Sequence, residues 1–165
     1  LNMTISLKHM GRRTGAVLVS LLLLLTLAVS ASAAAVKMTV GVRFWRESGD
    51  KESMADSSVD TTREATLTRQ PNGTFTLELP VKQLSSMNMT GRLTGIAIGE
   101  VNYDGTLSGD LSDGTAVLTL KNLPASVLTG SDSNKALAVT CSIKMDTILL
   151  GDITTSAKMS IWVER

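Results

Sequence analysis

The sequence predicts an all-β fold of antiparallel strands, and three observations support this prediction. Apolar and polar residues alternate with the period of two that is typical of a half-buried strand, most clearly from Val36 to Phe44. Turn signals such as Asn72-Gly73 recur between the alternating stretches. Helical periodicity never extends beyond two turns. Together they predict an antiparallel, immunoglobulin-like β-sandwich of seven to eight strands.

The first 33 residues have the order of a secretory signal peptide. A basic start is followed by an apolar run from Ala16 to Val29 and by small residues with an A-x-A site at Ala31–Ala33. The apolar run is shorter than the ~20 residues that a membrane-spanning helix needs. We therefore expect residues 1–33 to be a signal peptide. Residues 34–165 are then one domain, secreted or associated with the cell surface, with no membrane insertion after cleavage.

The remaining strands follow in order along the chain. They are predicted over Ala65–Arg69, Thr74–Val81, the alternating stretch 93–103, Thr115–Leu120, Leu137–Met145 and Ala157–Val163. The turns between them carry Asn72-Gly73, Asp104-Gly105 and Asp113-Gly114. Residues 34–165 are enough for one domain with its own core.

The charge of the predicted domain argues against a nucleic-acid partner. The leader holds three of the 16 Lys and Arg residues and none of the 15 Asp and Glu residues, so the domain has 13 basic and 15 acidic residues. The resulting net charge of −2, without a basic run, lacks the electrostatic signature of nucleic-acid binding.

Most catalytic arrangements are missing from the sequence. The single histidine, His9, lies in the predicted leader, so the domain has no imidazole for a catalytic triad or an ordinary metal site. The single cysteine, Cys141, lies on the apolar face of a predicted strand, where a buried and inert thiol is expected. We therefore predict that the protein is not an enzyme.

Methionine is the unusual residue type of the predicted domain. Met38, Met145 and Met159 occupy predicted inward faces, where methionine usually fills a core. Met54 is different, because it lies in the polar stretch "DKESMADSSVD" (50–60) after the first strand. A methionine in such a loop raises the question of what the loop covers.

Several stretches together resemble the NEAT (near-transporter) domain, the haem-binding β-sandwich of Gram-positive surface and secreted proteins. They are, in order, "SMAD", "ATLT" with "NGTFTLEL", "NYDG", and the closing pair "VTCSIKM" and "SAKMSIWVE", and they cover nearly the whole domain. The resemblance implies haem capture or relay for iron acquisition. The implied partners are haem or a haem-carrying protein, together with other surface haem-relay proteins.

The resemblance also implies a set of site residues. The "SMAD" loop is similar to the short helical lip that covers the haem pocket, so Ser53 matches the serine that contacts a haem propionate and Met54 projects over the ligand. The family's Y-x-x-x-Y iron-ligand pair has no match, because no tyrosine lies between Met145 and Val163. A surface haem protein related to this family uses two methionine thioethers instead, and by that resemblance Met54 with Met145 or Met159 is the expected cofactor-binding set, with Met54 and Met145 as iron ligands.

Two further binding classes remain open as alternatives to haem. A protein-binding or adhesive module is favoured by the Met-rich loop "SSMNMTG" (85–91), since methionine surfaces adapt to partners. A glycan-binding module needs aromatic side chains on an outer face. Trp45 and Trp162 hold outward positions, and they come together if the first and last strands pair.

Overall fold

The strands and helices come from a computed structural model that describes residues 34–86, 89–146 and 151–164. The predicted leader 1–33 and residues Met87 and Asn88 of the Met-rich loop lie outside these residues. The strands are β1 (Val36–Arg46), β2 (Ala65–Arg69), β3 (Phe75–Pro80), β4 (Leu84–Ser86), β5 (Met89–Ile98), β6 (Val101–Asp104), β7 (Thr106–Ser108), β8 (Val117–Leu123), β9 (Leu137–Met145) and β10 (Asp152–Val163). Two short 3-10 helices are η2 (Met54–Ser58) and η3 (Ala125–Val127).

The antiparallel strands form one continuous curled sheet, which confirms the predicted all-β, immunoglobulin-like sandwich. Its order is β4-β5-β9-β10-β1-β2-β3-β8-β7, and β6 pairs with β5. Strands β4, β6 and β7 are only three or four residues long, which is why the sequence predicts seven to eight strands and the sheet has ten. No helix of the described residues is long and apolar enough to span a membrane.

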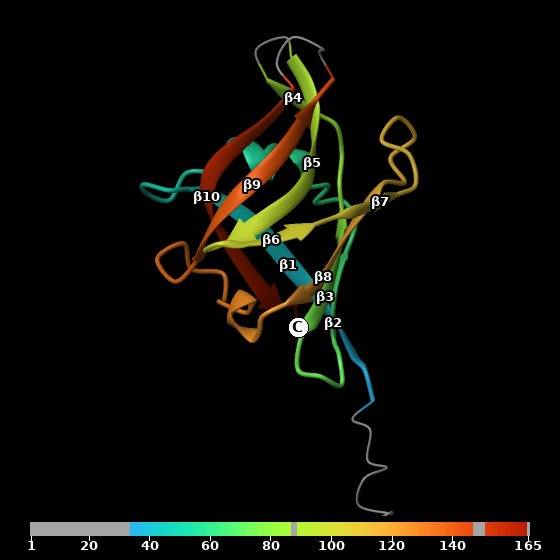
Figure 1. Ribbon diagram of the computed structural model, residues 1–165, viewed down its shortest axis with the longest axis vertical. Coiled ribbons are helices and arrows are strands. Elements are labelled where there is room, and N and C mark those ends of the chain that lie inside the picture. The colour runs from blue at the N-terminus through green and yellow to red at the C-terminus, as the bar shows by residue number, and fades with distance from the viewer. Residues whose placement is uncertain (1–33, 87–88, 147–150, 165) are drawn as a thin grey trace, which may run out of the picture. The chain divides into compact units, whose positions relative to one another are not determined.

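Strand β1 belongs to both layers of the sandwich. Its residues 36–40 pair with β2, and its residues 40–46 pair with β10. In Figure 1, β1 runs from the side of β2 and β3 to the side of β9 and β10. The strand therefore changes partner at Val40, and beyond that residue its edge on the β2 side must find other partners.

The opposite side of the sandwich closes in a similar way. Strand β6 pairs with β5 and the following β7 pairs with β8, so the chain passes from one layer to the other at Gly105. The Gly105 N–H donates to the Thr94 carbonyl oxygen at 2.8 Å. A Cβ at this position would lie 2.8 Å from the Thr94 carbonyl oxygen and would also overlap the Leu118 side chain, so the close approach of the backbones requires glycine.

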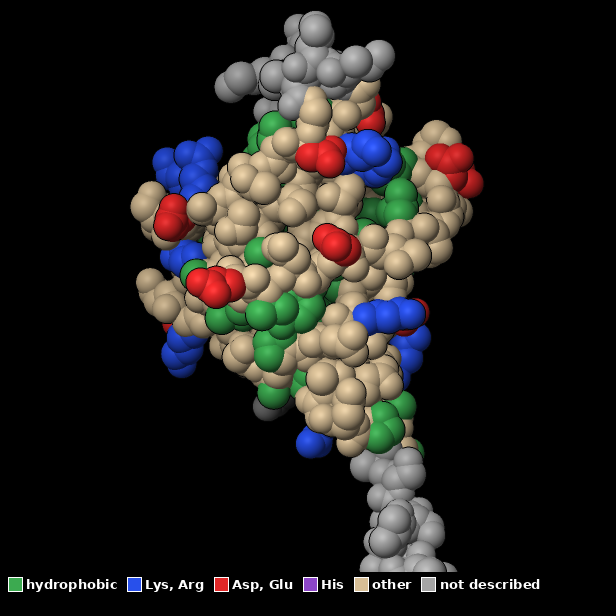
Figure 2. Space-filling model, viewed as in Figure 1, with side chains coloured by type: hydrophobic (Ala, Val, Ile, Leu, Met, Phe, Trp, Pro, Cys, Tyr) green, Lys and Arg blue, Asp and Glu red, His purple; other side chains and the backbone are tan. Residues whose placement is uncertain are grey.

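The core lies between the two layers and is built from the inward positions that the alternation predicts. Its largest fully buried side chains are Phe44, Leu67, Leu77, Leu79, Leu84, Leu93, Ile96, Leu118, Leu120, Leu123, Ile143 and Met159. On the face that Figure 2 shows, Lys and Arg side chains and Asp and Glu side chains are scattered, and a group of hydrophobic side chains lies in its lower middle.

Strand β10 begins earlier than the sequence predicts, at Asp152 instead of Ala157. Its added residues alternate between exposed and half-buried, with Ile153 and Thr155 on the inward face. Because Thr155 is polar, the stretch 152–156 lacks the apolar alternation that marks the rest of the strand. Hydrogen bonding to β9, which begins with Asp152 opposite Lys144, makes this stretch a strand although its own sequence pattern does not predict one.

We expect the Cys141 thiol to be inert in the native protein, because burial raises its pKa to about 12 from an ordinary value of 9.0. The thiolate fraction falls tenfold per pKa unit, so modification by a disulfide reagent at pH 8 should slow by on the order of a thousandfold relative to the unfolded chain. Rates measured with and without denaturant test this, with Cys141→Ser as the blank. Rapid native modification would show an accessible thiol.

Candidate functional site

Helix η2 is hydrogen-bonded to the edge of β1 at Phe44, beyond Val40, where β1 no longer pairs with β2. The Phe44 N–H donates to Asp56 Oδ1 at 2.7 Å, and the Ser53 N–H donates to the Phe44 carbonyl oxygen at 2.8 Å. At the other end, the Lys82 N–H donates to the Ser58 carbonyl oxygen at 2.8 Å. The helix packs against β1, β4 and β5. It is therefore a short element held at both ends by hydrogen bonds.

Asp56 was not singled out by the sequence analysis, and it anchors this helix. Its side chain is buried, and burial raises its pKa above the ordinary value of 3.8, although the hydrogen bond from the Phe44 N–H acts in the opposite direction. The only sequence signal is an aspartate beside Ala55 in a loop that otherwise looks solvated. A buried carboxylate that accepts a backbone N–H bond acts here as a structural cap for the edge of β1.

Ser53 precedes η2 and is only 7% exposed. Its hydroxyl has no hydrogen-bond partner among the described residues, and it does not cap the helix that follows. A buried hydroxyl without a partner costs about 1–3 kcal/mol. This orphaned polar atom lies at the residue that the NEAT resemblance assigns to ligand contact.

The three methionines of the predicted site differ in their surroundings. Met54 on η2 is half-buried and packs against the core, whereas Met145 on β9 is 6% exposed and lies opposite Gly91 of β5. Met159 on β10 is fully buried, between Phe44 of β1 and Leu137 of β9.

The strand register separates Met145 from Met159. Lys144 pairs with Asp152 and Leu137 pairs with Met159, so the two methionines lie at opposite ends of the β9–β10 pairing, about eight residues apart along a strand. At ~3.3 Å per residue this is a separation of roughly 26 Å. They cannot share one ligand, so Met54 can act with only one of them.

The end of β10 next to the hairpin presents Ile153 and Thr155 on its inward face, both half-buried. Neither side chain is an iron ligand. Tyr103, the only tyrosine of the chain, lies on β6 opposite Ile96 of β5. Within the described residues, no group of three or more His, Cys, Asp or Glu side chains is placed to hold a metal ion. The thioethers of Met54 and Met145 as iron ligands stay a prediction.

The two tryptophans share the outer face of β1 and β10, but they are not adjacent. The first and last strands do pair, as the glycan hypothesis requires, yet Trp162 lies opposite Gly41 and Trp45 lies opposite Lys158. Arg43 stands between the tryptophans on β1 and stacks over the Trp45 ring, 5.7 Å from its centroid. The expected side-by-side placement of the two tryptophans is therefore wrong, because Trp162 lies opposite Gly41, four positions before Trp45 along β1.

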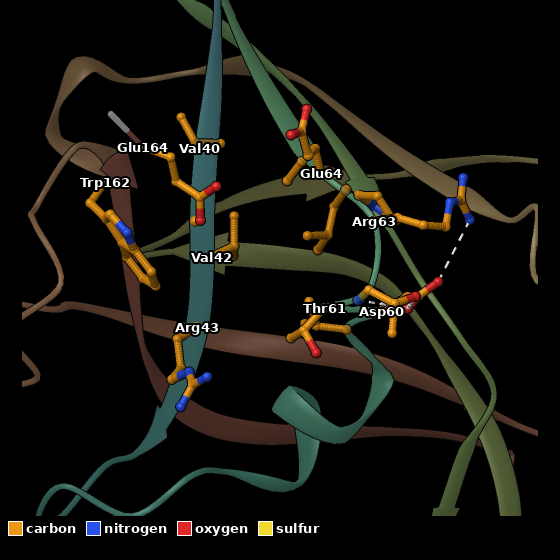
Figure 3. A pocket seen from close by; sticks show the side chains of 15 residues that line it. Val40, Val42, Arg43, Asp60, Thr61, Arg63, Glu64, Trp162 and Glu164 are labelled. Atoms are coloured by element: carbon orange, nitrogen blue, oxygen red, sulfur yellow. Dashed lines mark hydrogen bonds and ion pairs between the residues drawn. The ribbon is translucent and has the colours of Figure 1, made fainter.

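A groove that the sequence analysis missed opens beside β1. It has a volume of about 210 Å³ and is lined by β1 residues 40–43, residues 59–65, Leu79, Pro80, Trp162 and Glu164. Figure 3 shows Trp162 on one side of β1 and the Asp60–Glu64 segment on the other. No local sequence signal marks this groove, because it arises where β1 and the chain before β2 diverge.

Comparison with known proteins finds solved structures with a similar fold. No family model matches the sequence, and no curated protein matches it. Among solved structures, the NEAT5 domain of IsdX2, a B. anthracis hemophore in complex with heme, matches with a TM-score of 0.50 and 10% identity. The match covers 80% of this chain and 99% of that chain. A mutant of the same domain in complex with heme matches equally, over 98% of its chain. The chain therefore has a NEAT-like fold.

We predict that Asp56 makes the stability of the protein depend on pH. Between the ordinary carboxyl pKa and the raised pKa of folded Asp56, the folded state binds more protons than the unfolded state. The free energy of unfolding should therefore fall as pH rises through that window. Asp56→Asn removes this contribution and should flatten the curve, as measured by urea unfolding from about pH 3.5 to 8.

Asp56→Ala should also lower the free energy of unfolding by about 1–3 kcal/mol, because it leaves the Phe44 N–H without a partner. Asp50→Ala, an exposed residue of the same loop, is the control and should change stability by less than about 0.5 kcal/mol. Parallel pH curves for the Asp56→Asn and native proteins would contradict the prediction.

Proposed function

We propose that this protein binds haem between η2 and the β9–β10 hairpin, and that it captures or relays haem for iron acquisition. The observation that carries the proposal is the buried Ser53 hydroxyl, which has no hydrogen-bond partner among the described residues at the start of η2. A hydroxyl donates well to a carboxylate, so a haem propionate is a matched partner. The NEAT-like fold, shared with a domain solved with heme, supports this choice of ligand.

Side chains of η2 and of the start of β10 suit the apolar part of the ligand. Met54 and Ile153 are partly buried and pack against the core, so each has apolar surface left to cover. Thr155 is the next inward residue of β10 and is also half-buried. These side chains would contact the faces of a porphyrin, while Ser53 would bind a propionate.

Met54 and Met145 are the residues that we assign to the iron. Both carry a thioether, and neither is as fully enclosed as Met159, whose position between Phe44 and Leu137 suits a core residue. When bound through thioethers, haem iron favours the ferrous state and has a raised reduction potential. This assignment accounts for a haem-binding domain without the family's tyrosine pair.

The proposed partners follow from this activity. The protein would take haem directly or from a haem-carrying protein, and other surface haem-relay proteins of a Gram-positive cell would receive it. This role requires a location outside the membrane, secreted or at the cell surface, which the signal-like leader 1–33 supports. The role is binding and transfer, with no catalysed reaction.

Titration of haemin into the protein should give a saturable Soret band with one haem per chain, and a low-spin spectrum on reduction. Met54→Ala and Met145→Leu should each abolish the low-spin ferrous spectrum and weaken binding by about tenfold or more, equivalent to ~1.4 kcal/mol. Met38→Leu is the matched control, because Met38 is a partly buried methionine on the β2 side of β1 and should leave the spectrum unchanged.

Ser53→Ala should affect haemin affinity and the stability of the ligand-free protein differently, which a purely structural role of Ser53 would not explain. It should weaken haemin binding by about ten- to a hundredfold, since a hydrogen bond to a charged group contributes about 1.5–3 kcal/mol. It should also maintain or raise the stability of the ligand-free protein, because it removes an unpartnered buried hydroxyl. Haemin spectra that match free haemin throughout would overturn the proposed function.

A further inference from the structure

The groove beside β1 contains an unpaired stretch of strand edge. Strand alternation directs the backbone N–H and C=O of Val40, Val42 and Phe44 toward the β2 side. Val40 pairs with Ala65, and Phe44 bonds to Ser53 and Asp56. Val42 lies between these two and faces Ile161 of β10 on its other side, but within the described residues it has no partner strand on the β2 side, where it lines the groove. Backbone N–H and C=O groups without protein partners at a groove can pair with an extended ligand that supplies both an acceptor and a donor.

The Trp162 ring forms a wall of the same groove because Gly41 has no side chain. Gly41 lies opposite Trp162 in the β1–β10 pairing, and a Cβ on Gly41 would overlap the indole ring. The ring therefore packs against Gly41 and lines the groove from the side of β1 opposite the Asp60–Glu64 segment (Figure 3). Its Nε1–H has no protein acceptor among the described residues, whereas the Nε1–H of Trp45 donates to Ser160 Oγ at 2.9 Å.

The charges around the groove favour a cation. Glu64 and Glu164 line it from the two sides of β1 and form no ion pair within the described part of the chain. The neighbouring cations are already engaged. The Arg43 guanidinium bonds to Glu52 at 2.7 Å, and that of Arg63 donates to the carbonyl oxygens of residues 114–116.

We infer that this groove binds a basic side chain, arginine or lysine, within an extended segment of a partner protein. The cation lies against the Trp162 ring and beside Glu64 and Glu164, and the backbone of the same residue pairs with Val42. The volume of about 210 Å³ is below the ~300–1,000 Å³ of a typical small-molecule pocket, which suits one side chain. The site is separate from η2 and does not depend on haem binding.

The test uses the peptide acetyl-Gly-Thr-Arg-Thr-Gly-amide as the probe. In the Trp45→Phe protein, Trp162 is the only tryptophan, so its fluorescence reports on the groove directly. The peptide should bind saturably and shift the Val42 amide resonance. Replacing its arginine by citrulline, which keeps the shape and removes the charge, should weaken binding at least tenfold. An Nα-methyl arginine should weaken it about two- to tenfold, through the loss of one backbone hydrogen bond.

Variants of the protein separate the contributions of the groove residues. Glu64→Gln with Glu164→Gln should weaken peptide binding about five- to tenfold, and Gly41→Ala should weaken it by displacing the Trp162 ring. Glu100→Gln, an exposed residue in the turn between β5 and β6, should have no effect. The Gln variants should keep the native haemin titration, so a failure here is distinct from a failure of the haem proposal.

Three results would overturn the inference. One is equal binding of the arginine and citrulline peptides, and another is a Val42 amide that does not shift on saturation. The third is absence of peptide binding at millimolar concentration, whether or not a neutral sugar such as N-acetylglucosamine binds in the groove.

Discussion

The fold depends on one constraint, which is that the backbone edge of β1 must be satisfied after the strand leaves β2 at Val40. Buried N–H and C=O groups require partners, and β2 no longer provides them. The chain meets this need at Phe44 by turning back through residues 47–53 and placing Ser53 and Asp56 against its backbone. The position of η2 is thus a consequence of the strand that joins the two layers.

The two candidate binding sites lie at neighbouring parts of this same edge. At Phe44 the edge is closed by η2, which brings Ser53 and Met54 against the core. At Val42 the edge is left open, and the groove with Trp162 begins there. One change of strand partner therefore produces both a covered site for an apolar ligand and an open site for an extended one.

The chemistry of the two sites is complementary. The site at η2 offers an orphaned hydroxyl, apolar side chains and thioethers, and it has neither the tyrosine nor the histidine that usually binds ferric haem. The groove offers carboxylates, an indole ring and a backbone edge, which suit a cation on a peptide. The proposed haem site and the proposed peptide groove would thus select ligands of different kinds.

The sequence by itself determined the longer strands, because the alternation of apolar and polar residues depends only on which face of each strand is buried. It also indicated the unusual Met54 and the inert Cys141, which follow from residue type and periodicity. Only the tertiary structure decided the buried cap at Asp56, the early start of β10 and the groove at Val42, because each depends on which distant strand lies alongside. It likewise separated Met145 from Met159, since strand register is a property of the pairing and cannot be read from either strand alone.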